Sequence, residues 1–385
     1  MYFFFGVDVH VTNYTVVVLQ PPIIGMSNCE SVIHETRVLR PDYNEIIKMV
    51  DMYKKTYGES TTVIIGYEAG CLGTSLYREL EKHKLKCIIL APTTMASTPL
   101  DDLYKNDKRD AKKIAECLVT GLYKSVYVNT QHNEAVANLI RLRDSAQERV
   151  KIIKQQTMAY CHRFGFIFAS TYWTNKHFEW FKGLQFDEPL AREILDDYLL
   201  DLQTATERVE FYDKRIAEVA DEAKYADSVA KLGCFLGMSQ ARSLAVIAEI
   251  GDFKRFDSAN HFASYLGLVP GIHASGNKNP RRPITKAGNS HLRKLLVEAA
   301  QGICKGQTGH KSKELKKRQS GQSDVVVAYA DKGNIRFRKK YYRMIHAGKM
   351  RNTAVTAIAR ELACFIWGMM TNHYNVAGVS GENVA

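Results

Sequence analysis

The first 130 residues contain five short apolar runs that predict β-strands. The first two, at 2–9 and 13–20, are rich in β-branched and aromatic side chains and are separated by a short turn region at 10–12, and a third at 31–39 alternates well enough for a strand. The run at 61–67 is apolar throughout, which is typical of a strand buried on both faces. A further strand is expected at 86–91.

Segments with the apolar spacing of helices lie between and after the later strands. They are expected at 43–57, near 74–84 and at roughly 107–122. The first three strands therefore follow one another directly, whereas the later strands alternate with helices. Antiparallel strands followed by parallel α/β units predict a mixed sheet of the ribonuclease-H type.

The rest of the chain has mainly helical patterning. Two long helical stretches, 133–165 and 188–228, are predicted to pair as an antiparallel arm. Between them, 166–186 is rich in aromatic residues, and a packed tip or partner contact is favoured there over stacking on nucleic-acid bases. Further helices are expected within 231–250 (two, joined by a tight turn) and at 260–268, 290–303 and 352–371, while 305–334 is a polar stretch.

Charge is spread unevenly along the 385 residues. Residues 231–360 carry 25 Lys and Arg against 7 Asp and Glu, a net +18, while the whole chain carries +12, so the remainder sums to −6. This asymmetry favours a basic half that binds nucleic acid.

Cysteine usage and the N-terminus bear on location. The eight cysteines are scattered singly without a Cys-x-x-Cys pair, which fits a reducing cytosol. The apolar start of the chain is short and interrupted by Asp8, unlike a signal peptide. No run approaches the roughly 18 apolar residues expected of a membrane span. We therefore expect a soluble, cytoplasmic protein with no membrane partner.

Four carboxylates stand out against the predicted sheet. Asp8 lies inside an apolar strand, where a lone charge is costly unless a partner such as a divalent metal ion offsets its burial. Glu68 follows the buried strand, and Asp107 and Asp110 lie three apart and hence on one face of a helix. In a ribonuclease-H sheet these positions converge at one edge, where their oxygen atoms would suit Mg²⁺.

Three of these four carboxylates also have a simpler interpretation, whereas Asp8 is the hardest to explain without a functional role. Asp107 and Asp110, taken alone, fit a solvated helix face better than a metal site. Glu68 fits a helix cap. His10 shares the face of Asp8 if the strand continues, but a histidine in the turn is the favoured interpretation.

The run 271–289 combines one serine with several cations and almost no acid. It predicts a basic loop in which Ser275, beside Gly276, faces an anion. The loop alone favours simple phosphate binding, and Ser275 becomes a candidate nucleophile only in combination with the carboxylates. The residues predicted to bind nucleic acid are Lys278, Arg281, Arg282, Lys286, Arg293, Lys316, Lys317 and Arg318.

A second candidate phosphate site lies at 237–243, which resembles a helix-hairpin-helix turn. Ser239 stands at the usual second glycine and Ser243 at the usual alanine. A phosphate-binding turn and an ordinary helix–helix turn are equally supported.

At these residues the chain resembles the DEDD insertion-sequence transposases, the "one-ten" family and its relatives, which include the Piv-type DNA invertases. The resemblance covers roughly 1–125 and 230–303. Its seven motifs are weak singly and specific in combination. They are GVDVH at 6–10, YEAG at 67–70, KNDKRDA at 105–111, AEIGD at 248–252, YLGLVP at 265–270, SG at 275–276, and ITKAGN at 284–289 with LR at 292–293.

The resemblance implies three domains and a tail. They are a RuvC-like domain at 1–130, a helical coiled-coil connector at 131–228 and a mostly helical transposase domain with the serine loop at 229–372, followed by a tail at 373–385.

The resemblance also implies a site and its partners. Asp8, Glu68, Asp107 and Asp110 would be the catalytic ligands of Mg²⁺, and Ser275 would form a covalent phosphoserine link to DNA. Partners would be donor and target DNA, a noncoding bridge RNA and further copies of the chain in a dimer or tetramer. The acidic cluster of one subunit would meet the serine of another.

Three features depart from the family pattern: Val11 stands where Lys is common, Asn106 stands where Thr is usual, and the glycines of the helix-hairpin-helix turn are depleted. None of them removes a presumed catalytic residue, so an active site-specific recombinase is the leading hypothesis. One alternative is a RuvC-like, Mg²⁺-dependent nuclease that uses no serine. The other is a non-catalytic nucleic-acid-binding accessory protein.

Overall fold

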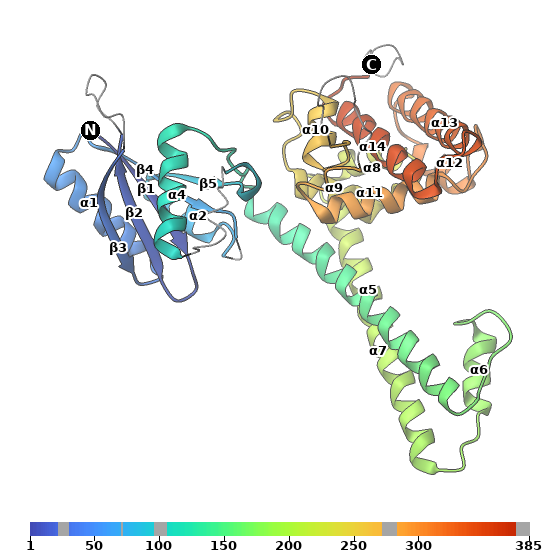
Figure 1. Cartoon of the computed structure of the whole chain (residues 1–385). Coiled ribbons are helices and arrows are strands. Elements are labelled where there is room, and N and C mark those ends of the chain that lie inside the picture. Colours follow the sequence, from blue (N-terminus) through green and yellow to red (C-terminus); the bar gives the residue numbers. More distant parts are fainter. Residues whose placement is uncertain (22–30, 71, 96–105, 272–282, 375–385) are drawn as a thin grey trace. The chain divides into compact units, whose positions relative to one another are not determined.

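The computed structural model forms two compact units, Met1–Val128 and Asn129–Ala385 (Figure 1). The residues that it describes are 1–21, 31–70, 72–95, 106–271 and 283–374. Ser275, Lys278, Arg281 and Arg282, to which the sequence assigns catalytic or binding roles, lie outside the described residues.

The first unit is built on a five-stranded mixed sheet in the order β3-β2-β1-β4-β5. The first three strands are antiparallel, and β4 and β5 extend the sheet in parallel on the other side of β1. This is the predicted ribonuclease-H type of arrangement. The strands are β1 (Tyr2–Val9), β2 (Tyr14–Gln20), β3 (Val32–Leu39), β4 (Thr62–Glu68) and β5 (Lys86–Leu90).

Helices cover both faces of this sheet. On one face, α1 (Tyr43–Tyr57) and α2 (Ser75–Lys82) bury their apolar sides against alternate residues of β1. On the other face, α4 (Asp107–Thr120) packs on the remaining residues of β1, β4 and β5. A short 3₁₀ turn, η1 (Pro92–Thr94), follows β5. Because β1 and β4 are covered on both sides, they are apolar almost throughout.

A glycine brings α4 unusually close to β1. A Cβ atom added at Gly6 would collide with the Ala111 carbonyl oxygen and the Ala115 amide nitrogen of α4. The helix therefore lies backbone against backbone on the strand at this point. Asp8 lies two residues further along β1, and Asp107 lies one helical turn before Ala111, so this contact draws the two carboxylates together.

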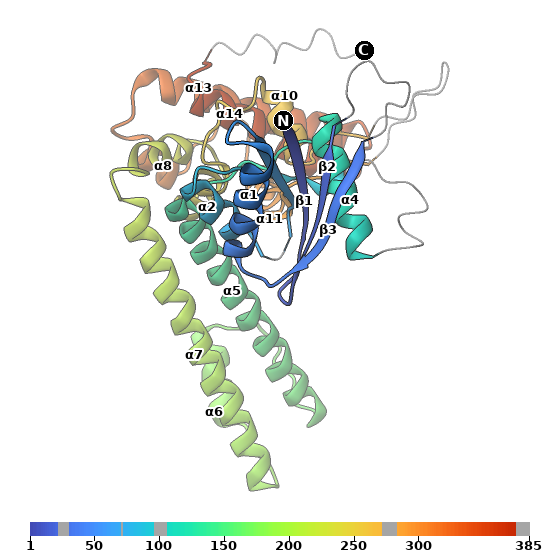
Figure 2. The same ribbon diagram turned by 90° about the vertical axis from the view of Figure 1, so that its left-hand side faces the viewer.

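The second unit begins with a helical hairpin. Helices α5 (Gln131–Arg163) and α7 (Pro189–Ala220) run antiparallel and share a row of buried apolar residues (Figures 1 and 2). The predicted stretch 188–228 is not one helix, because α7 ends at Ala220 and α8 (Ala226–Gly233) starts after a turn. The supercoiling of a coiled coil stays a prediction.

The aromatic-rich segment forms the tip of this hairpin, as the sequence analysis favoured. It contains α6 (Asn175–Gly183), a helix not predicted from the sequence. Phe181 is fully buried, and Phe166, Trp173 and Trp180 pack around it.

The remaining helices pack into one large core. They are α9 (Gln240–Ile250), α10 (Ala259–Tyr265), α11 (Ser290–Ile303), α12 (Lys313–Gln319), α13 (Asp324–His346) and α14 (Arg351–Met370). The sequence analysis predicted no helix in the polar stretch 305–334, which is wrong because α12 and the start of α13 lie there. α13 has an apolar stripe (Val326, Tyr329, Ala330, Phe337), but Lys and Arg on its other side hide that stripe in the sequence.

Helix α14 is long and apolar enough to cross a membrane by length and composition, which the sequence analysis did not anticipate. However, 67% of its most apolar window is buried inside the unit, where it packs against α10, α11 and α13. These contacts give α14 the role of a core helix.

We predict that Gly6→Ala destabilises the first unit by about 1–3 kcal/mol, the usual cost of overpacking, because the added methyl meets backbone that cannot rotate away. Faster hydrogen–deuterium exchange in β1 and β4 measures this effect. Gly70→Ala is the matched control, since its added Cβ would meet only the Glu68 carbonyl oxygen at 3.9 Å. Unchanged exchange in Gly6→Ala would contradict the close approach.

Candidate active site

Three side chains of the first unit converge at the end of β1. The Nε2 atom of His10 lies 3.1 Å from Oδ2 of Asp8 and 3.7 Å from Oδ1 of Asp107. Among the described residues, these three offer ligand atoms that all lie within 4.8 Å of one another. The structure thus joins Asp8 to Asp107 and adds His10, for which the sequence analysis favoured a simple turn role.

His10 is nevertheless a turn residue. Its backbone N–H donates to the carbonyl oxygen of Asn13 in the connection between β1 and β2. The imidazole is half exposed and turns back toward the sheet edge. His10 is therefore both a turn residue and a neighbour of the acidic cluster. The sequence signal for the second role was the alternation of strand residues, which places His10 on the same face as Asp8.

The start of α4 is fixed by its capping residue. Asn106 has an extended backbone, and its side chain accepts a hydrogen bond from the N–H of Arg109 at 2.9 Å. Asn and Thr both serve as N-caps, so Asn106 preserves the helix start where Thr is usual. Asp107 and Asp110 then fall in the first turn, where the helix dipole favours negative charge.

The electrostatics of the cluster favour a cation. Burial raises the pKa of the Asp8 carboxyl above its ordinary value of 3.8, and contact with His10 opposes that shift. The charges of Asp110 and Asp107 raise the pKa further, so Asp110 belongs to the same electrostatic site. A bound cation would relieve this repulsion, and the donor set of mainly carboxylate oxygen fits a hard divalent ion.

Glu68 lies one strand away from this cluster. Val7 pairs with Tyr67 in the β1–β4 ladder, so Glu68 stands beside Asp8 at the end of the neighbouring strand. Gly66, two residues earlier, faces Leu118 of α4, which places Glu68 on the α4 side of the sheet. Its carboxylate is exposed and lies outside the 4.8 Å group.

In the second unit, the two ends of segment 272–282 are held together. The Gly271 N–H donates to the Pro283 carbonyl at 3.0 Å, and Thr285 N–H donates to Val269 at 2.9 Å. Pro270 and Ile284 form an isolated antiparallel bridge. The segment that contains Ser275 therefore begins and ends at a fixed base.

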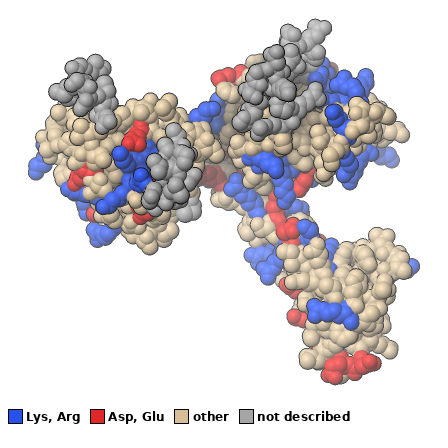
Figure 3. Space-filling view, in the orientation of Figure 1, with Lys and Arg blue, Asp and Glu red and all other residues tan. Residues whose placement is uncertain are grey.

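The predicted binding cations that the structure describes fall into two groups. Lys286, Lys316 and Lys317 are exposed. Arg293 instead donates to the carbonyls of Leu266 and Ala287 at 3.0 and 3.2 Å, and Arg318 donates to that of Met238. These two arginines hold the fold, and their role in nucleic-acid binding stays a prediction. Figure 3 shows Lys and Arg gathered over the region of α12 and α13.

The helix-hairpin-helix-like turn lies between α8 and α9. Ser239 caps α9 by accepting a hydrogen bond from the N–H of Arg242. Gly237 has φ 77° and lies against the Ala299 backbone, which leaves no room for a side chain. The turn thus docks on α11, and phosphate binding there stays a prediction.

Sequence reasoning missed a buried charge cluster beside the base of the serine segment. Glu249 of α9 is 2% exposed and lies 2.5 Å from Nδ1 of His291, whose Nε2 lies 3.0 Å from Asp144 of α5. Arg141 and Asn289 also donate to Glu249. The cluster ties α5 and α9 to the start of α11, and its sequence signals were motif 248–252, which contains Glu249, and motif 284–289, which contains Asn289.

Both ring nitrogens of His291 face carboxylates. Hydrogen bonds to Asp144 and Glu249 raise the pKa of His291 to about 9, against an opposing effect of burial. Burial raises the pKa of Glu249, but hydrogen bonds from His291 and Arg141 lower it overall. His291 is therefore an imidazolium at neutral pH, balanced by two carboxylates.

We predict that the second unit loses stability between pH 7 and pH 10. The pKa of His291 is about 9 when folded against 6.5 unfolded, so its contribution is complete below 6.5 and disappears as pH rises through 9. The free energy of unfolding should fall by roughly 1–3 kcal/mol. Tryptophan fluorescence in urea measures it, because Trp173, Trp180 and Trp367 all lie in this unit.

His291→Gln is the matched variant for that measurement. At pH 7 this variant should be less stable than the parent protein. Its free energy of unfolding should also fall much less than that of the parent between pH 7 and pH 10. An equal decline in the variant would show that other groups cause it.

Two family models match the chain in different regions. A transposase model of the DEDD, IS110 type matches residues 5–160, which include the whole acidic cluster. A model described as the transposase IS116/IS110/IS902 family matches residues 230–316, which include the serine segment.

Curated relatives agree with these matches. A putative transposase, y4qE, of Sinorhizobium fredii is 33% identical over 79% of this chain and 74% of that protein. The transposase for insertion sequence element IS1533 of Leptospira borgpetersenii is 30% identical over 87% of this chain and 94% of that protein. The transposase for insertion sequence element IS1111A of Coxiella burnetii is 26% identical over 59% of this chain and 64% of that protein. The chain therefore belongs to the IS110/IS116/IS902 family of insertion-sequence transposases and is a DNA transposase.

Proposed function

We propose that the acidic cluster of the first unit cleaves DNA phosphodiester bonds, with Mg²⁺ as cofactor, during the movement of an insertion sequence. The observation that carries this proposal is the convergence of Asp8, His10 and Asp107 within 4.8 Å. A divalent ion there would stabilise charge on the phosphate oxygens and activate an attacking hydroxyl group.

The residues of the chain have separate tasks in this proposal. Asp8 and Asp107 are the nearest oxygen ligands, one from the sheet and one from α4. Asp110 adds negative charge that favours cation binding, and Glu68 offers a further carboxylate from the next strand. His10 orients Asp8 through their hydrogen bond and lies at the exposed rim, where a DNA strand would arrive.

We predict that Asp8→Asn lowers the rate of DNA cleavage by at least about a hundredfold. Changes to groups that merely support a metal ligand cost about 10–100-fold, and Asp8 would itself be a ligand. A cleavage assay on labelled DNA with added Mg²⁺ measures the rate. Asp51→Asn, at an exposed position of α1, removes the same charge and should leave the rate unchanged. Parental cleavage by Asp8→Asn would refute the assignment.

We further propose that Ser275 supplies the attacking hydroxyl. The support is the fixed base at Gly271 and Pro283, together with the cations that the sequence places in the same segment. A covalent phosphoserine link would conserve the energy of the phosphodiester, so rejoining would need no nucleotide cofactor. The alternative is attack by water, for which the acidic cluster suffices.

We predict that the parental enzyme forms a protein–DNA adduct that survives a denaturing gel, and that Ser275→Ala abolishes it. Ser264→Ala, at an exposed position of α10, is the control and should retain the adduct. Cleavage without any adduct would favour the water-dependent nuclease. An adduct that persists in Ser275→Ala would assign the nucleophile to another residue.

The proposed partners follow from charge and from the family resemblance. Donor and target DNA would contact the basic residues of 231–360. A noncoding bridge RNA would choose the sites by base pairing, which leaves the protein to bind backbone and shape. A dimer or tetramer would let the acidic cluster of one subunit act with the serine segment of another.

A further inference from the structure

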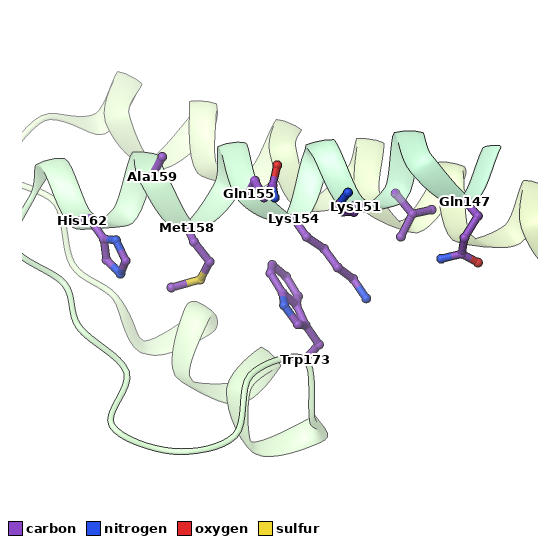
Figure 4. A pocket seen from close by; sticks show the side chains of 9 residues that line it. Gln147, Lys151, Lys154, Gln155, Met158, Ala159, His162 and Trp173 are labelled. Carbon is purple, nitrogen blue, oxygen red and sulfur yellow. The ribbon is translucent and has the colours of Figure 1, made fainter. Parts of the chain in front are cut away.

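The tip of the helical hairpin contains a hollow that none of the steps proposed above uses. It lies between α5 and the segment that leads into α6, and its volume is about 470 Å³ (Figure 4). This volume is within the range of about 300–1,000 Å³ that is usual for ligand sites. The side chains that matter for its chemistry are Gln147, Lys151, Lys154, Met158, His162 and Trp173.

Trp173 is held over the hollow in an unusual backbone conformation. Its φ is 64°, in the left-handed region that bulky residues rarely adopt. Its backbone N–H donates to Nδ1 of His177 at 2.9 Å, which fixes this conformation. Backbone strain of this kind is concentrated at functional sites.

The group that holds Trp173 is itself costly to bury. His177 is fully buried and lies between Phe168 and Phe181, with ring centroids 4.4 and 4.3 Å away. Burial lowers its pKa, so the ring is neutral, and its Nε2 has no hydrogen-bond partner among the described residues. An orphaned buried N–H is unfavourable, and the hydrogen bond to Trp173 is the evident gain.

The opposite wall of the hollow is positively charged. The ammonium of Lys154 lies 5.1 Å from the centroid of the Trp173 ring and forms no ion pair within the described chain. Lys151 pairs with Glu148 at 2.8 Å, but both side chains are more than half exposed, so that pair is weak. Helix α5 carries six Lys and Arg against three Asp and Glu, whereas α7 carries four against eight.

We propose that this hollow binds an unpaired stretch of a nucleic-acid strand. A base would displace the ammonium of Lys154 from the indole of Trp173 and stack there, while Lys151, Lys154 and His162 would face the phosphates. The amide of Gln147 offers a donor and an acceptor to a base edge. This inference deepens the proposed function and rests on it, because strand cleavage and exchange expose unpaired nucleotides.

Tryptophan fluorescence of the whole protein tests the proposal, in EDTA so that binding is measured without cleavage. A short single-stranded oligothymidylate should quench the emission, and Trp173→Phe should remove most of that quenching. The other tryptophans, Trp180 and Trp367, do not line the hollow. Asp8→Asn should quench like the parent, so a failure of the cleavage proposal is distinguished from a failure of this one.

Two matched variants test the charge. Lys154→Gln should raise the midpoint of the quenching titration by about fivefold or more, since one phosphate contact is lost. Lys176→Gln removes an equal charge from an exposed position of α6 outside the hollow and should leave the midpoint unchanged. Equal midpoints for both variants would overturn the role of Lys154.

Three results would overturn the proposal as a whole. One is an absence of quenching by the oligonucleotide, and another is full quenching in Trp173→Phe. The third is equal or stronger quenching by a duplex or by polyglutamate at the same ionic strength. A duplex has no unpaired base to stack, and polyglutamate would assign the hollow to an acidic protein segment.

Discussion

The proposed chemistry of the first unit depends on one contact, the backbone-to-backbone approach of α4 to β1 at Gly6. A buried carboxylate on a central strand is unfavourable alone, and a carboxylate at a helix start is ordinary. The missing side chain at Gly6 lets the helix come close enough for Asp8 and Asp107 to share His10. The apolar contacts on both faces of the sheet then stabilise this approach.

In the second unit, the feature that matters most for the proposed chemistry is the way in which the two ends of segment 272–282 are held together. Backbone hydrogen bonds from Gly271 to the Pro283 carbonyl and from Thr285 to the Val269 carbonyl close the base. The buried pair of Glu249 and His291 fixes the start of α11 just beyond it. A buried ion pair contributes little net stability compared with an apolar core, but it defines one arrangement of the groups that it joins.

The sequence predicted most of the first unit, because its signals are local. Runs of apolar residues locate the strands, and their order leaves few possible sheets. It also placed Asp8, Glu68, Asp107 and Asp110 at one site, and of these the structure brings Asp8 and Asp107 within 4.8 Å of each other and of His10. What it did not predict depends on contacts between distant residues. The contact of His10 with Asp107 and the cluster at Glu249 become visible only when elements far apart in sequence are packed together. The apolar stripe of α13 is a local pattern that was missed because cations on the other side of the helix obscure it.

The closed base of segment 272–282 has a consequence for how this enzyme can vary. Because a hydrogen bond from the Gly271 N–H to the Pro283 carbonyl fixes both ends, a longer or different sequence between them would add only a small cost in loop-closure entropy. A library of grafted segments that retains Ser275 would therefore vary the contacts of this segment with the DNA backbone while the closed base stays the same.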